Sequence, residues 1–593
     1  MQVRRGRRSV LATSLPKSVC LFPQAVPAAA RIKVLVLISG LRPSLLLLGA
    51  AFGTAAVAQQ LPSAGGQLQQ LPPAPAPRVG TPDISVERPG SRTGPLDTGP
   101  AFPVAALRIT GQTLFDEPTL LAATGFAPNA NLSLGDLQAM AARITAFYSA
   151  RGYFVAQAYV PAQSLAGGTV TIAVIEGRYG KVGVANSSGV ADRVVRQRLA
   201  GLDAGDVVAN APLERRLLLL SDLPGVAVKS TLSPGTDVGT SDLAVDVLPG
   251  RRVFGSVEAD NGGNRYTGYF RAGGQINLAN PLGIGDVVSV RGLVSDRGLT
   301  YVRGAYQAPL GAATIGVAYA RLDYRLHREF ESLDASGSAD IASVFASYPA
   351  IRSYNYNLNL LAGLDYKMFN DRVASVGASS NKHSTVGFLG LSGDWRDSLG
   401  GGGSGFYSAI VSIGSLDIRT PAVLALDAQT GRTQGGFTKL NLAAGRLQTL
   451  SGPLSLYLAA RGQIASKNLD ISEKMQLGGA YGVRAYPEGE AFGDQGYIAT
   501  AELRLLLGAL SRSVPGDVQL FGFIDNGGIT FNRNRYAAGV NSANLTGGGG
   551  GISWSAPNNF LVRASYARRL GNTPVMSQPD KMGQIWVQIT KLF

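Results

Sequence analysis

The chain has 593 residues, with 76 glycines, 21 tyrosines and 21 phenylalanines but only 16% charged residues. This composition is untypical of helix-rich enzymes and of acidic disordered proteins, and it favours many short strands and turns. The net charge is +15, but eight Lys and Arg residues and no acid lie in residues 1–58, which leaves +7 for the rest. That charge is too dilute for a nucleic-acid-binding surface, so no nucleic acid is expected among the partners.

Few residues are suited to catalysis or metal binding. Cys20 is the only cysteine, and His327 and His383 are the only histidines. The sequence therefore predicts no disulfide, no zinc site, no cofactor and no catalytic residues, and hence a protein that is not an enzyme. Both histidines fall between strand patterns and are predicted in loops. The runs GGNR (262–265) and GGGGG (547–551) lack the lysine of a phosphate-binding loop and are predicted as hairpin or loop glycines.

The N-terminal segment has the pattern of an export signal. A basic start is followed by an apolar run from Leu45 and by Ala56 and Ala58 before Gln59. We interpret residues 1–58 as a signal peptide for the Sec route, and its unusual length leaves open a start codon further downstream. Residues 59–100 are rich in Pro, Gly, Ala and Gln, which predicts an extended linker.

Two small α+β modules are predicted next, the first module at 101–177 and the second module at 178–250. In the first module, Ser133 is a natural N-cap and Gly152 a natural stop for the longer helix. Both modules have the order strand, helix, helix, strand, strand. The predicted elements are 103–110, 117–123, 134–150, 153–160 and 169–175, and then 181–185, 191–199, 212–223, 226–232 and 243–247. An exposed sheet edge in such a module can add a strand from an extended client, although the modules could also be packed spacers.

Residues 251–593 are predicted to form a transmembrane antiparallel β-barrel. In Phe270–Leu278, apolar and small residues alternate with polar ones, as expected of a strand with one lipid-facing side. At about 10 residues a strand plus connections, the segment holds roughly 16 strands, with 14 to 18 acceptable. The last strand ends at Phe593 with Ile585, Val587 and Ile589 on the same face, which resembles the assembly signal of bacterial outer-membrane barrels. Lys591 shares that face, where it can snorkel to the interface.

The loop 476–496, QLGGAYGVRAYPEGEAFGDQG, is dense in glycine and has Arg484 near its middle. A long barrel loop either extends into solvent or folds back into the lumen. An arginine inside the lumen needs a carboxylate partner to offset its desolvation.

Several motifs together resemble a known family. They are VRAY (483–486) with a later Gly493-Asp494, NPLGIGD (280–286), YPAIRS (348–353) heading a strand, FIDNG (523–527) and SYARRL (565–570). With two modules before a barrel, the chain resembles over about residues 100–593 the outer-membrane transporters of two-partner secretion, of the haemolysin secretion/activation type. The modules are then similar to POTRA (polypeptide-transport-associated) domains.

The resemblance implies the functional residues of the barrel. In that family the arginine of the lumenal loop meets the aspartate of an F-x-D-x-G motif on the inner wall. Carried over, the loop motif is Val483, Arg484, Ala485 and Tyr486, and the wall motif is Phe523, Asp525 and Gly527. Ala485 departs from the usual glycine, so the backbone there must tolerate a Cβ. The family also places an N-terminal helix in the pore as a plug. Residues 64–71 are short and glycine-rich for such a helix, so a plug within the linker at 59–100 stays possible but unsupported by the sequence.

The resemblance also implies the function. The modules would capture an unfolded exoprotein, commonly a large β-helical protein, in the periplasm, and the barrel would conduct it outward. The protein would lie in the outer membrane with its modules in the periplasm, in contact with lipid and inserted by the barrel assembly machinery. Two alternatives stay open. One is an assembly factor for other barrels, although about five modules are then usual, and the other is a solute-conducting pore.

Overall fold

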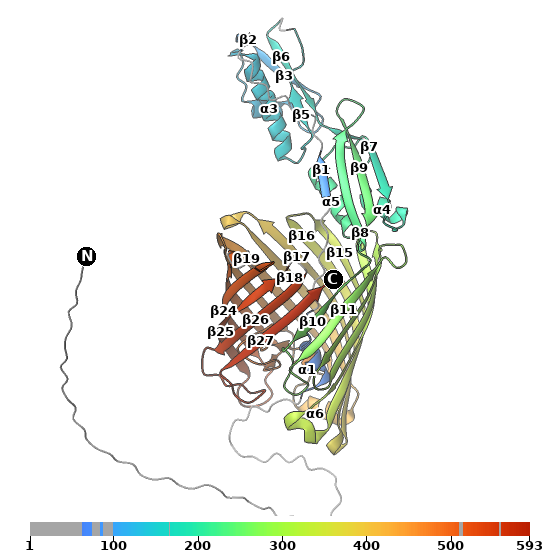
Figure 1. The fold of residues 1–593 in the computed structure, drawn as a ribbon, viewed down its shortest axis with the longest axis vertical. Helices are drawn as coiled ribbons and strands as arrows, with labels where there is room; N and C mark the ends of the chain where they lie inside the picture. Colours follow the sequence, from blue (N-terminus) through green and yellow to red (C-terminus); the bar gives the residue numbers. More distant parts are fainter. Residues whose placement is uncertain (1–61, 74–82, 87–98, 165–166, 509–513, 557–558) are drawn as a thin grey trace, which may run out of the picture. The chain divides into compact units, whose positions relative to one another are not determined.

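The computed structural model describes residues 62–73, 83–86, 99–164, 167–508, 514–556 and 559–593 (Figure 1). The predicted signal peptide lies outside the described residues. Within these ranges, no helix is both long and apolar enough to cross a membrane.

The first module packs two helices against a small sheet. Its elements are β2 (Phe102–Val104), β3 (Ala106–Thr110), α2 (Glu117–Thr124), β4 (Ala130–Leu132), α3 (Leu134–Ala150), β5 (Gln157–Tyr159) and β6 (Thr169–Ile175). Helix α3 has the predicted bounds, and the Ser133 hydroxyl caps it by accepting the Asp136 N–H. The single strand predicted at 103–110 is wrong. The chain bends at Ala105, so β2 pairs with the additional strand β4, while β3 joins β6 and β5.

A buried carboxylate joins the last strand of the first module to its start. Glu176 is 5% exposed and accepts hydrogen bonds from the backbone N–H groups of Thr113 and Leu114, from the Thr113 hydroxyl and from the Tyr148 hydroxyl. Burial opposes ionisation of Glu176, but the four hydrogen bonds outweigh it and lower the pKa of this group.

Replacing Glu176 with glutamine should destabilise the first module by about 1–3 kcal/mol near pH 7, because the remaining donors lose a charged acceptor. A lowered pKa gives stability that is present above the unfolded value of about 4.3 and is lost as the pH falls through the folded value. The urea concentration at which residues 101–177 of the full chain become protease-sensitive should therefore differ between wild type and variant near pH 7 and converge in acid. Equal urea midpoints near pH 7 would contradict this role.

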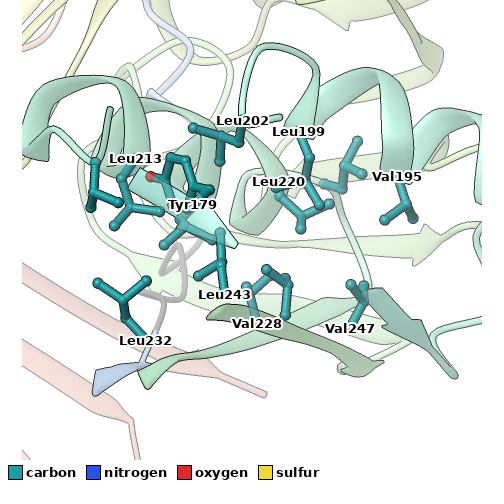
Figure 2. Packing of buried hydrophobic residues seen from close by; sticks show 14 of the residues in the cluster. Tyr179, Val195, Leu199, Leu202, Leu213, Leu220, Val228, Leu232, Leu243 and Val247 are labelled. Atoms are coloured by element: carbon teal, nitrogen blue, oxygen red, sulfur yellow. The ribbon is translucent and has the colours of Figure 1, made fainter. Parts of the chain in front are cut away.

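The second module consists of β7 (Arg178–Asn186), α4 (Asp192–Leu199), α5 (Asn210–Ser221), β8 (Val226–Pro234) and β9 (Thr240–Pro249). Leu199, Leu213 and Leu220 of the helical side pack against Val228 and Leu243 of the strands (Figure 2). The sheet order is β1-β8-β9-β7, in which β1 (Asp83–Val86) comes from the predicted linker and pairs in parallel with β8. Part of the linker therefore completes this sheet.

Sixteen antiparallel strands close into a barrel, which confirms the predicted fold class and strand number. The strands are β10 (Val253–Asp260), β11 (Arg271–Ala279), β12 (Val287–Ser295), β13 (Leu299–Leu310), β14 (Ala313–Arg325), β15 (Ala335–Arg352), β16 (Tyr356–Val373), β17 (Ala378–Asp397), β18 (Gly403–Ile418), β19 (Gly435–Ser451), β20 (Leu454–Ala465), β23 (Gln495–Leu506), β24 (Asp517–Thr530), β25 (Ser542–Ser555), β26 (Phe560–Arg569) and β27 (Gly583–Leu592). Between them lie the short helices η1 (Arg328–Leu333), η2 (Ala374–Val376), η3 (Leu399–Gly401) and α6 (Pro421–Gln429).

The alternation of side chains follows the prediction. Phe270 and Ile276 are 66% and 51% exposed on the outer face, whereas Arg271 and Asn277 are 6% and 5% exposed on the inner face. The last strand β27 pairs with β10, and reciprocal backbone hydrogen bonds between Gly255 and Phe593 extend this pairing to the C-terminus. The outer face is apolar and the lumen polar, as a membrane barrel requires.

Three interpretations from the sequence, those of His383, of YPAIRS and of the glycine run, are wrong. His383 lies within β17, which at 20 residues is much longer than the roughly 10 needed to cross a bilayer. His327 does lie in a loop, directly before η1. YPAIRS ends β15 instead of heading a strand, with a bulge at Pro349 that accommodates the missing N–H. The GGGGG run lies inside strand β25 instead of in a loop.

Candidate functional site: a loop held inside the barrel

The lumenal loop (476–496) leaves and re-enters the wall through a short ladder. Helix η4 (Ile471–Glu473) precedes β21 (Met475–Gln476), which pairs with β22 (Phe492–Gly493). Between these strands the chain turns back on itself, with hydrogen bonds from Val483 N to Leu477 O at 2.9 Å and from Gly479 N to Tyr486 O at 3.0 Å. Gly479 has φ +100°, and a Cβ there would overlap the Glu488 carboxylate, so only glycine fits this turn.

Arg484 lies at the centre of the site and is 7% exposed. Its Nε and Nη2 donate to the two oxygens of Asp525, each at 2.8 Å, and its Nη1 donates to Glu502 Oε2 at 2.8 Å. We call these three residues the Arg484 cluster. The bidentate geometry matches the fork of the guanidinium to a carboxylate, and the second carboxylate uses a further donor. The structure thus brings the predicted pair together and adds Glu502, which the sequence reasoning missed.

The wall motif supplies three different contacts. The Phe523 ring lies 3.4 Å from the guanidinium carbon of Arg484, so the cation rests on an aromatic face. Asp525 is fully buried and also accepts the Thr500 hydroxyl at 2.9 Å. At Gly527, a Cβ would come within 2.4 Å of Leu477 Cδ1. The glycine therefore leaves space for an apolar side chain of the loop.

The methyl group of Ala485 meets a glycine of the wall. Ala485 is fully buried, and a Cβ built on Gly547 of β25 would lie 2.3 Å from that of Ala485. Farther along the same inner face, Cβ atoms on Gly549 and Gly551 would come within 2.9 Å of Phe523 and 2.6 Å of Phe521. The glycine run is therefore a flat stretch of strand that admits the loop and the rings beneath it, and Gly547 accommodates the departure from the family pattern.

The other residues of the loop motif are held in place by the C-terminal part of the barrel sequence. Val483 is fully buried and Tyr486 is 1% exposed, with the Tyr486 hydroxyl donating to Thr573 O at 3.1 Å. On β27, the Trp586 indole N–H donates to Arg484 O at 2.7 Å. Sequence reasoning missed Trp586 too. An indole on the inner face of a barrel strand was the available signal, because Trp residues usually lie on the outer face at the membrane interfaces.

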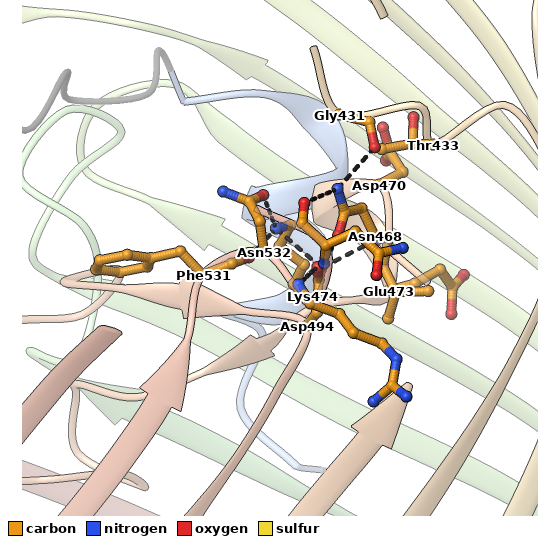
Figure 3. A network of polar contacts seen from close by, with 12 residues as sticks. Gly431, Thr433, Asn468, Asp470, Glu473, Lys474, Asp494, Phe531 and Asn532 are labelled. Atoms are coloured by element: carbon orange, nitrogen blue, oxygen red, sulfur yellow. Dashed lines mark hydrogen bonds and ion pairs between the residues drawn. The ribbon is translucent and has the colours of Figure 1, made fainter. Parts of the chain in front are cut away.

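A second polar network holds the base of the loop (Figure 3). Asp494, which is fully buried, accepts from Lys474 Nζ at 2.9 Å and from the backbone N–H groups of Leu469 and Arg533. Asn468 donates to Gly431 O and Asn534 O, each at 2.8 Å. The network therefore joins three separate loops at one end of the barrel. Gly493-Asp494 was part of the family resemblance, but this connection was not predicted.

Helix η4 is tied to the wall and supports a helix from the N-terminus. Glu473 binds Lys367 of β16 at 2.7 Å and Lys439 of β19 at 2.8 Å. The N-terminal helix α1 (Ala64–Gln69), which we call the lumenal helix, packs against η4 inside the barrel (Figure 1). The sequence left a pore helix possible but unsupported, and the structure has one at Ala64–Gln69.

The glycines of the lumenal helix are what allow it to fit. A Cβ on Gly65 would lie 2.8 Å from Ser472 Cβ, so glycine permits the close approach to η4. On the other side, Ala64 N donates to Asp371 Oδ1 of β16 at 2.8 Å, and Arg271 Nη1 donates to Gln70 O at 2.9 Å. The lumenal helix thus bridges the wall of the barrel and the segment that leads into the lumenal loop.

The lumenal loop and the lumenal helix are held inside the barrel by noncovalent contacts. The buried ion pairs of Arg484 with Asp525 and Glu502 fix the position of the loop. Among the described residues, no group of three or more His, Cys, Asp or Glu side chains could hold a metal ion.

Comparison with known proteins follows the same division of the chain. The model of the haemolysin secretion/activation protein ShlB/FhaC/HecB matches residues 239–554, and a POTRA domain of ShlB type matches residues 102–177. The chain is 29% identical over 468 residues to the heme/hemopexin transporter protein HuxB of Haemophilus influenzae, covering 78% of this chain and 82% of that protein. It is 24% identical over 521 residues to the outer membrane transporter CdiB of Escherichia coli O6:K15:H31, covering 84% of each.

A solved structure has the same fold. The structure of CdiB from Escherichia coli matches with a TM-score of 0.66 at 22% identity, covering 85% of this chain and 93% of that one. Because the family model spans more than half of the chain, and the barrel and the module before it agree with it, the chain belongs to the haemolysin secretion/activation protein family ShlB/FhaC/HecB.

Proposed function

We propose that this protein is the outer-membrane transporter of a two-partner secretion system, which binds one unfolded exoprotein in the periplasm and passes it outward through the barrel. The observation that carries the proposal is the Arg484 cluster, which holds a family-specific loop inside a closed 16-strand barrel. A loop that noncovalent contacts hold inside the lumen favours a role in transporting a polypeptide over a role in catalysing a reaction. Folding of the exoprotein outside the cell would supply the free energy.

Strand addition is the proposed mode of capture. The edge of β8 in the second module already accepts an extended segment, because β1 pairs with it from Asp83↔Lys229 to Val86↔Leu232. Backbone hydrogen bonds of this kind bind extended chains with little dependence on sequence. This supports a module surface that binds an unfolded client, with the chain's own linker occupying one of its edges when no client is bound.

The remaining partners follow from the barrel. Exposed apolar residues such as Phe270 and Ile276 lie on the outer face, where we propose that they contact outer-membrane lipid. A strand that ends at Phe593 and closes on β10 supports insertion by the barrel assembly machinery. We also propose that the protein performs no chemical reaction on its client.

Deleting residues 100–250 tests the capture step. The reporter is the extracellular protein that disappears from the medium when the gene of this chain is deleted. We expect the shortened chain to insert into the outer membrane, as judged by heat-modifiable mobility of the barrel on gels, but to leave the reporter in the cell. Undiminished secretion by a correctly inserted, shortened chain would contradict capture by the modules.

A further inference from the structure

A cavity of about 310 Å³ lies between the lumenal loop and the wall. Arg484 and Glu502 line one side, and Tyr457, Arg504, Arg563 and Trp586 line the others. Arg504 lies near the end of β23 and Arg563 near the start of β26, at the same end of the barrel as the start of β10, which follows the second module. The cavity therefore extends from the Arg484 cluster toward the periplasmic end of the barrel.

Three guanidinium groups of this region share one carboxylate. Glu502, whose side chain is 2% exposed, accepts from Arg484 Nη1 at 2.8 Å, from Arg504 Nε at 2.9 Å and from Arg563 Nη2 at 2.7 Å. With Asp525, two carboxylates face three arginines, and the remaining charged residues of the lining, Asp260 and Arg271, neutralise each other in an ion pair, so one positive charge remains uncompensated. Gathering like charges is unfavourable, and a positive cavity of this kind attracts negatively charged groups.

The two arginines at the cavity have donors to spare. Arg504 and Arg563 each make one hydrogen bond with a partner among the described residues, in both cases to Glu502, although a guanidinium carries five N–H groups. Each guanidinium stacks on an aromatic ring. The guanidinium carbon of Arg504 lies 4.6 Å from the centre of the Tyr457 ring, and that of Arg563 lies 4.0 Å from the centre of the Phe521 ring. The rings hold the planes of the cations in place without consuming their N–H groups.

The chemistry of the walls selects a ligand class. Free guanidinium N–H groups bind carboxylates and backbone carbonyl oxygens, and Tyr457 and Trp586 contribute apolar surface to the cavity wall. An extended polypeptide carries carbonyl oxygens along its whole length and carboxylates wherever Asp or Glu occurs. Folded clients would not fit a cavity of this volume.

On this basis we propose that the cavity around Arg504 and Arg563 is a docking site for an extended, acidic segment of the transported polypeptide, reached from the periplasm before the lumenal loop. The proposal rests on the transport function proposed above and names a site of contact for the client within the barrel. Glu502 occupies the arginines when the site is empty, and a carboxylate of the client replaces part of that contact.

A tryptophan in the cavity wall can report peptide binding through its fluorescence. The chain has three tryptophans, of which Trp586 lines the cavity, whereas Trp395 and Trp554 alternate onto the outer face of β17 and β25. Replacing Trp395 and Trp554 with phenylalanine in the full chain leaves Trp586 as the sole indole. An unstructured 20-residue peptide rich in glutamate is then titrated into the detergent-solubilised protein, with the same peptide carrying lysines as the second arm.

We expect the glutamate peptide to change the Trp586 fluorescence saturably and the lysine peptide to leave it unchanged. Replacing Arg504 and Arg563 together with glutamine should raise the half-saturating concentration roughly ten-fold or more, because charge-assisted hydrogen bonds are lost. The matched control is Arg568→Gln, since Arg568 is on the same strand as Arg563 but on the outer face. It should behave as the parent does.

An unchanged half-saturating concentration in the double variant, with its barrel folded by heat-modifiable mobility, would overturn the proposal. So would an equal loss in Arg568→Gln or equal binding of the lysine peptide. These outcomes are separable from a failure of the transport function. If the protein is a transporter but lacks this docking site, deleting its gene still removes the exoprotein from the medium. If the protein is not a transporter, deleting its gene leaves the medium unchanged.

Discussion

Replacing Arg484 with alanine is expected to reduce secretion of the exoprotein at least ten-fold. The substitution leaves Asp525, which is fully buried, without its cation, and breaking a buried ion pair in this way costs about 3–5 kcal/mol. The loop also loses the stacking contact with Phe523 and is no longer fixed to the wall. Secretion is measured as the fraction of the exoprotein in the medium, at equal amounts of inserted barrel.

The partner substitution gives the internal control. Asp525→Ala should impair secretion to a similar extent, and the double variant should be little worse than either single one, because both remove the same interaction. Arg484→Lys should be intermediate, since an ammonium keeps the charge but cannot contact both Asp525 oxygens and Glu502. Losses that add up in the double variant would mean that the two residues act separately.

Replacing Gly65 with alanine should displace the lumenal helix and raise the conductance of the channel several-fold in planar bilayers. The new methyl group would lie 2.8 Å from Ser472 Cβ and 3.0 Å from the Ser472 backbone. Glu473 next to it is bound by two lysines, so η4 is not free to move aside. Alanine improves intrinsic helix stability by about 1 kcal/mol, so any loss of docking comes from the contact and not from the helix itself.

Gly66→Ala is the matched control for this change, at the next position of the same helix. Its methyl group would lie 3.2 Å from Ile471 Cδ1, the end of a flexible side chain that can rotate away. We therefore expect a conductance close to that of wild type. Equal increases for both variants would show that the helix responds to added bulk in general, and no increase for Gly65→Ala would show that η4 does not hold it.

The features that sequence predicted well are those with local or periodic causes. Alternation of apolar and polar residues gave the barrel, because neighbouring strand residues face opposite sides. The bounds of α3 followed from Ser133 and Gly152, which act on the backbone next to them. The pairing of Arg484 with Asp525 came from two short motifs that resemble those of the family, although 41 residues separate them.

The lumenal helix could not be predicted for a physical reason. Six residues that include two glycines have little helical stability of their own. The helix forms because distant residues hold it, with 307 residues between Ala64 and Asp371 and 403 between Gln69 and Ser472. The same glycines that argue against a helix in isolation are required by the contact with η4.

The glycine run of β25 shows the same difficulty in the wall. A run of five glycines predicts a loop because glycine weakens an isolated strand. In the barrel both neighbouring strands pair with β25, and the space above Gly547, Gly549 and Gly551 is filled by Ala485 and two phenylalanine rings. Composition does not reveal which side chains will lie over a glycine, so neither this role nor those of Glu502 and Trp586 could be predicted.

The central claim is that this chain exports one protein, and quantitative proteomics after deletion of its gene tests it most directly. Medium, periplasm and outer membrane are compared with those of the parent strain. We predict that one large exoprotein disappears from the medium while the levels of other outer-membrane barrels stay unchanged. An unchanged medium, or a general fall in other outer-membrane barrels, would contradict the account and favour a solute pore in the first case and an assembly factor in the second.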